Sequence, residues 1–209
     1  AIASLGCFGK HPQNVERDLE RWTNKLYGLR LEPYFITLNL TLPGALRAEP
    51  VSVPMLLPHE WLHAVWEAGD MQRRVTLFGP GGQSGLEDYW RHQLCFEWAR
   101  NHPGLHDPNK TFPLAFFTDG GEVYRNQETL WYFFRSSLSK GNTLDIILPL
   151  IGLPLEYVAT REAFDEANEK ITKALCWSTG WAEIGIGPEV GLYMEAFGKD
   201  TIRYALRGK

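Results

Sequence analysis

The sequence predicts an α/β fold with three consecutive strands and then a long helix in the C-terminal half, preceded by a mainly helical region. Three runs rich in β-branched and aromatic residues, 112–117, 129–138 and 143–150, follow one another directly. A helical pattern follows over 160–179. We therefore divide the chain into a mainly helical region, 1–108, and an α/β region, 109–209. With a length of 209 residues, the two regions can pack together as one domain.

The composition is that of a soluble globular protein. Hydrophobic residues make up 44% and charged residues 22%, which allows a substantial core. The net charge of −4 does not favour a broadly basic surface for nucleic acid. The three cysteines are widely spaced and predict reduced thiols in an intracellular compartment. The most apolar run, 146–155, is too short to span a membrane and is broken by proline and glycine.

The first half of the chain contains two clear elements before its central glycines. Apolar residues at helical spacing predict a helix over 12–27, and alternation predicts a strand over 34–40. Residues 43–54 are expected to form a loop or a short extended segment. Pro58 suits the first turn of a helix that reaches Ala68.

Glycines at 79–82 predict a sharp break, and a second helix is expected after them. Ser84 and Glu87 have the spacing of a capping box for a helix to about Arg100. A loop is expected over 101–108.

In the second half, local sequence predicts a hairpin between the first two strands. Asp119-Gly120-Gly121 has the composition of its turn. The third run is apolar almost throughout, which is typical of a strand covered on both faces. Thr160 is the expected N-cap of the long helix, and Gly180 its expected end. Weakly helical sequence follows over 181–209.

One short motif matches a zinc signature. His59, Glu60 and His63 form the pattern H-E-x-x-H, in which two histidines on one helix face share a zinc ion and the glutamate activates water. Against this, Pro58 places the first histidine in the first turn of the helix rather than in its interior. An amphipathic helix with histidines at its rim is the favoured interpretation, and a zinc-dependent hydrolase is the alternative.

Asp119 is the second candidate for chemistry. A carboxylate associated with the first of three strands that precede a helix matches the opening of an RNase H-like domain. In two-metal nucleases of that fold, such a residue helps to hold Mg²⁺ or Mn²⁺ together with further carboxylates. Locally, a hairpin turn is the simpler interpretation.

Several segments, in this order, resemble a large multicopy protein family that is abundant in dinoflagellate genomes. They are residues 4–19, Leu57-Pro58-His59-Glu60, Gly79-Pro80-Gly81-Gly82-Gln83-Ser84, and Asp119-Gly120-Gly121 followed by Gln127 and Thr129-Leu130. The likeness covers the chain from Ser4 to about Leu150.

The resemblance extends distantly to CACTA-type transposases. It implies a mobile-element-derived protein, a degenerate or partial metal-dependent transposase or nuclease domain that acts on DNA in the nucleus. Asp119 would then match the first metal-binding carboxylate. The family has no second histidine after its Leu-Pro-His-Glu block, which makes His63 incidental. The third hypothesis is a non-catalytic interaction subunit whose many aromatic residues pack against protein partners.

Overall fold

The computed structural model describes residues 31–102, 105, 107–124, 127–140, 146–158 and 160–208. The helix expected over 12–27 lies outside these residues. Within them, no helix combines the length and the apolar character needed to cross a membrane.

The described chain begins with an antiparallel pair, β1 (Tyr34–Leu40) and β2 (Glu49–Met55). The predicted strand over 34–40 is confirmed, and its alternation is visible in burial, with Ile36, Leu38 and Leu40 all inside. The segment expected to be loop or extended thus contains a full strand. Its two prolines are compatible with β2 because β1 is its only partner in the described sheet.

Five helical segments follow: α2 (Pro58–Glu67), α3 (Asp70–Arg73), the π-helical η2 (Arg74–Phe78), α4 (Gly82–Gln93) and α5 (Glu97–Arg100). The helix opened by Pro58 is confirmed. The predicted capping box is wrong, because Ser84 lies inside α4, whose N-cap is Gly81 and has no side-chain hydrogen bond. The single helix to Arg100 is also wrong, since the chain breaks at Leu94 and resumes as α5.

The second sheet is a three-stranded antiparallel meander of β3 (Leu114–Tyr124), β4 (Gln127–Ser136) and β5 (Leu148–Pro154), in that order. The predicted turn at Asp119-Gly120-Gly121 is wrong. These residues continue β3 and pair with residues 129–131 of β4, so the two strands connect through 125–126. The ladder with β4 outweighs the local turn preference of Asp-Gly. β5 begins later than expected but is buried along nearly its whole length, as a strand covered on both faces should be.

A 3₁₀ turn, η3 (Leu155–Tyr157), leads to the long helix α7 (Arg161–Ile184), and the chain closes with α8 (Ile202–Leu206). The Thr160 cap is confirmed, because its side chain accepts a hydrogen bond from the Ala163 amide at 3.2 Å. The predicted end at Gly180 is wrong. The helix continues to Gly185, whose φ of 77° forms a left-handed C-cap.

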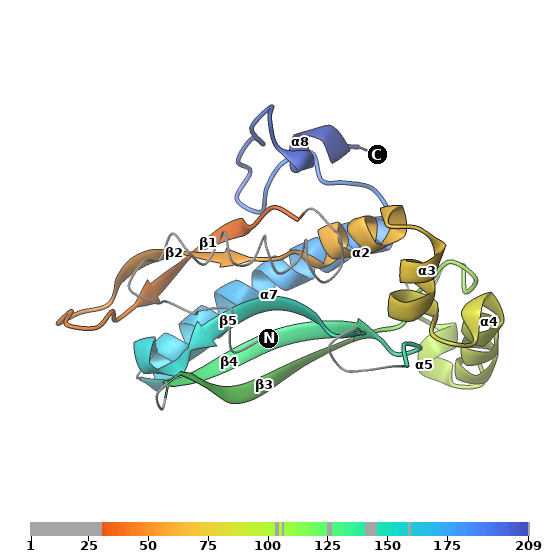
Figure 1. Ribbon diagram of the computed structural model, residues 1–209, viewed down its shortest axis with the longest axis horizontal. Coiled ribbons are helices and arrows are strands. Elements are labelled where there is room, and N and C mark those ends of the chain that lie inside the picture. The colour runs from red at the N-terminus through yellow and green to blue at the C-terminus, as the bar shows by residue number, and fades with distance from the viewer. Residues whose placement is uncertain are drawn as a thin grey trace.

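α7 joins the two sheets into one core. It runs between the β1–β2 hairpin and the β3–β5 sheet in Figure 1, and it packs against α2 and β1. The Tyr132 hydroxyl on β4 donates to Asn168 of α7 at 2.7 Å. Buried residues of β1, β2, α2, β4, β5 and α7 belong to one hydrophobic cluster. The predicted α/β class, with three strands followed by a long helix, therefore holds for the described chain.

Candidate functional site

Glu60, the central acid of the histidine motif, is buried and paired with a residue from the far end of the chain. Its carboxylate accepts two hydrogen bonds from the guanidinium of Arg203 in α8, one of them at 3.0 Å to Oε2. Glu60 and Arg203 keep only 6% and 10% of their side-chain exposure. Arg203 also donates to the carbonyls of Glu32 and Pro33. The pair therefore ties α2, the entry to β1 and α8 together.

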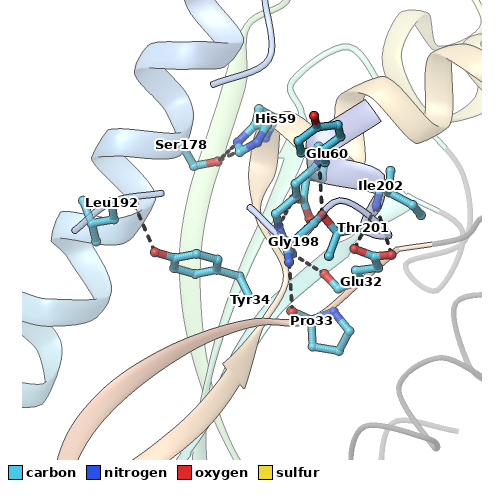
Figure 2. A network of polar contacts seen from close by, with 12 residues as sticks. Glu32, Pro33, Tyr34, His59, Glu60, Ser178, Leu192, Gly198, Thr201 and Ile202 are labelled. Atoms are coloured by element: carbon cyan, nitrogen blue, oxygen red, sulfur yellow. Dashed lines mark hydrogen bonds and ion pairs between the residues drawn. The ribbon is translucent and has the colours of Figure 1, made fainter. Parts of the chain in front are cut away.

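Further contacts hold the segment between α7 and α8 against β1. The Tyr34 hydroxyl donates to the Glu195 carboxylate and accepts from the Leu192 amide at 3.2 Å. The Glu32 carboxylate accepts from the Ile202 amide at 3.1 Å, at the start of α8. Figure 2 shows the Tyr34–Leu192 and Glu32–Ile202 contacts close to Glu60. We call residues 185–208 the C-terminal strap.

His59 is held by α7 on the other side of α2. Its backbone amide donates to the Ser178 hydroxyl at 3.2 Å, and its Nδ1 lies 2.8 Å from the same oxygen (Figure 2). Ser178 is completely buried, so this Ser–His contact is closed to a substrate and cannot act as a nucleophilic pair. Its chemical effect is to orient the imidazole.

Burial shifts the pKa values of these two motif residues in opposite directions. Burial, reinforced by Arg203 and His63, lowers the pKa of His59 to about 4, so the ring is neutral near pH 7. Burial raises the pKa of Glu60 to about 7, although Arg203 acts in the opposite direction. Both shifts follow from packing α2 beneath the strap and against α7.

A cavity of about 320 Å³ lies between α2, the end of α7 and the strap. We call it the α2–α8 pocket. His59, His63 and Trp66 line it from α2, and Arg203 from α8. Most of its surface is apolar, with a few polar groups that converge on it, as is typical of ligand sites.

A second cavity, of about 450 Å³, adjoins the first and lies over α4, α5 and β3. We call it the α5–β3 pocket. Both cavities are lined by Leu62, Lys110, Phe112 and Ala182, so they form one groove. Three large aromatic side chains line it while remaining 46%, 54% and 42% exposed; they are Trp66, Trp98 and Phe116.

Asp119, the other predicted site residue, is exposed on β3 and lines neither cavity. Its partner across the ladder is Trp131, and the same-face neighbours on β4 are Thr129 and Phe133. None of these three carries a carboxylate. Asp119 thus lies on the first strand of the meander, but the residues opposite it on β4 are not acidic.

The structure brings His59, Glu60 and His63 together at the α2–α8 pocket, but their roles differ from a zinc site. Glu60 is engaged by Arg203, and His59 uses Nδ1 for Ser178. Among the described residues, no three His, Cys, Asp or Glu side chains are grouped to hold a metal ion. Zinc binding therefore stays a prediction.

Sequence reasoning missed Arg203, Ser178 and the groove aromatics. Arg203 stands in weakly helical sequence 143 residues after Glu60, so no spacing rule connects them. Trp66 lies at the surface of α2, and no motif in the sequence distinguishes it from a tryptophan of the core. Comparisons with protein-family models, curated proteins and solved structures found no match to this chain.

Proposed function

We propose that this chain is a non-catalytic interaction module that binds a short apolar segment of a partner protein in the groove. One observation carries the proposal: exposed Trp66, Trp98 and Phe116 line two adjoining cavities. Large rings gathered on a concave surface favour binding, because a partner removes their apolar area from water and gains specific aromatic contacts.

The size of the groove limits the kind of partner. Cavities of about 320 and 450 Å³ each hold one or two large side chains, and fall in the usual range of ligand pockets, about 300–1,000 Å³. A short segment that inserts two or three side chains fits better than a flat domain surface. Lys110, which lines both cavities, adds a positive charge at their junction, whereas the carboxylate of Glu183 lines the α5–β3 pocket alone. An acidic group of the segment is therefore favoured on the side of the α2–α8 pocket.

Selection of a random peptide display library on the purified protein tests this function. We expect enriched peptides to be apolar or aromatic and acidic, and to lose at least tenfold in affinity for Trp98→Ala and Phe116→Ala, since interface aromatics are typical hot spots worth about 2 kcal/mol or more. The matched control is Phe35→Ala, because Phe35 is 46% exposed on β1 and lines neither cavity. The proposal fails if no peptide is enriched, or if Phe35→Ala weakens binding as much as Phe116→Ala.

A second function, a mobile-element-derived nuclease domain of RNase H-like fold, is supported by the position of Asp119. The residue lies on the first strand of an antiparallel meander that a 24-residue helix follows. In this proposal Asp119 binds Mg²⁺ or Mn²⁺ and the partner is DNA. Metal-dependent cleavage of DNA by the protein, abolished in Asp119→Asn, would support it. Absence of cleavage with either metal would exclude it.

A further inference from the structure

Apart from Glu60 and the two histidines, the polar side chains in the described lining of the α2–α8 pocket are hydrogen-bond donors. Trp66 and Trp181 both line it, and an indole can only donate. Lys110 likewise has three donors and no acceptor. The one carboxylate in the lining belongs to Glu60, whose two oxygens already accept from Arg203. A ligand that supplies acceptors matches this surface.

His59 adds a donor whose identity is set by its contact with Ser178. Among the contacts of the described chain, Nδ1 of His59 is the one acceptor for the Ser178 hydroxyl proton. The hydroxyl oxygen meanwhile accepts from the His59 amide. The neutral ring therefore carries its proton on Nε2, and this N–H is the imidazole group left for a ligand in the pocket.

The charges around the pocket favour an anion. Its lining contains two cations, Lys110 and Arg203, and one carboxylate, Glu60. Arg203 is compensated by Glu60, whereas Lys110 has no acidic partner among the described residues that line the pocket. Its partner outside the pocket, Asp107, is 3.6 Å away, and both side chains are exposed, so this pair is weak and easily exchanged.

The shape of the pocket favours a chain end over a chain that passes through. Residues 185–188 of the strap, together with Arg203 and Leu206 of α8, line the pocket on the side of the strap. An extended segment that enters from the α5–β3 pocket meets this wall. A volume of about 320 Å³ is sufficient for one large apolar side chain and a carboxylate.

We infer that the α2–α8 pocket receives the C-terminal carboxylate of the partner segment, with its last apolar side chain against Trp66 and Trp181. This inference rests on the proposed function, and names the chemical group that the groove selects. Lys110 supplies the charge and His59 Nε2–H a fixed donor. A charge-assisted hydrogen bond in a partly closed site adds specificity as well as affinity.

Three short peptides test the inference: acetyl-Trp-Leu-Phe with a free carboxylate, the same peptide as its C-terminal amide, and acetyl-Trp-Glu-Phe amide, whose only carboxylate is on a side chain. Their affinities are measured by calorimetry at pH 7. We expect the free acid to bind about tenfold more tightly than either amide, as a lost charge-assisted hydrogen bond predicts. In Lys110→Met this preference should fall several-fold. Lys140→Met is the matched control, because Lys140 is exposed and lines neither cavity.

The outcomes separate this inference from the function on which it rests. Equal binding of the free acid and its amide, weakened in Phe116→Ala, would overturn carboxylate recognition while leaving the groove as a peptide site. Tighter binding of the side-chain acid than of the free acid would likewise overturn selection of a chain end. If none of the three peptides binds, both the inference and the proposed function fail.

Discussion

Glu60 and Arg203 form a buried ion pair that joins α2 to α8 across 143 residues of sequence. The pair attaches the C-terminal strap to α2, and the strap in turn forms one wall of the α2–α8 pocket. Both ions are removed from water, and each is costly to bury without the other. The stability of the protein and the shape of its candidate site thus depend on the same contact.

Glu60→Leu should destabilise the protein by about 3–5 kcal/mol, because it leaves the buried Arg203 guanidinium without the carboxyl group that accepts its hydrogen bonds and balances its charge. The double variant Glu60→Leu, Arg203→Met removes both ions. We expect it to be more stable than Glu60→Leu alone, since no unpaired charge remains. Urea unfolding, monitored by circular dichroism, gives the free energies of unfolding of the unaltered protein, the single variant and the double variant.

The control for this cycle is the exposed pair between Arg91 and Asp88, whose side chains are 76% and 68% exposed. Asp88→Leu should change the free energy of unfolding by less than about 1 kcal/mol, because water screens such pairs. A double variant less stable than Glu60→Leu would contradict the ion-pair account and indicate that Arg203 acts mainly through its bonds to the Glu32 and Pro33 carbonyls.

The pKa values of His59 and Glu60 predict opposite pH dependences. The His59 pKa is lowered from its ordinary value of 6.5 to about 4, so the stability that the neutral ring contributes is present above pH 6.5 and is lost as pH falls toward 4. Burial of the Glu60 carboxyl group outweighs the attraction of Arg203 and raises its pKa from 4.5 to about 7. The protonated group still offers its carbonyl oxygen to Arg203, so its contribution to stability is complete below pH 4.5 and is lost as pH rises through 7. Between pH 7 and 4.5 the two effects oppose each other.

Relative to the unaltered protein, His59→Gln should gain about 2 kcal/mol of stability on acidification from pH 7 to 4.5, because it lacks the loss caused by the imidazole. Glu60→Gln should lose stability over the same interval, because it lacks the gain caused by the carboxyl group. Urea unfolding at a series of pH values measures both slopes. Parallel slopes for the two variants would show that neither residue titrates as its burial implies.

Local sequence was sufficient to predict the helices and strands that have a capping residue, a proline or an alternating pattern of their own. Pro58 marks the start of α2, Thr160 caps α7, and strict alternation marks β1. It was insufficient where a partner strand or a contact distant in sequence determines the structure. Asp119-Gly120-Gly121 favours a turn locally, yet its ladder with β4 keeps it extended. The Glu60–Arg203 pair is equally non-local, so the pocket that it borders could not be derived from motif spacing.

Trp131 and Gly152 face each other across the β4–β5 ladder, and this contact predicts a strict size limit. A Cβ added at Gly152 would lie 2.8 Å from Cζ3 of Trp131, closer than side chains tolerate. Gly152→Ala should therefore destabilise the protein by about 1–3 kcal/mol through overpacking. Gly152→Ala combined with Trp131→Phe, which replaces the indole by a smaller ring, should recover part of the loss. Thermal unfolding of the two variants measures the difference, and a neutral Gly152→Ala would disprove the contact.

Gly180 and Gly185 lie on the same helix and should respond to alanine with opposite signs. Gly180 is inside α7, and a Cβ there would meet nothing within 4 Å. Gly180→Ala should stabilise the protein by about 0.5–1 kcal/mol, because alanine loses less backbone entropy in a helix. Gly185 is the left-handed C-cap with φ 77°, so Gly185→Ala should destabilise by about 1 kcal/mol, although there is also open space for a Cβ. Urea unfolding of both variants shows whether each substitution raises or lowers the free energy of unfolding. Destabilisation by Gly180→Ala would mean that the helix ends near Gly180, as its sequence alone suggests, and that the strap and its pocket begin earlier than Gly185.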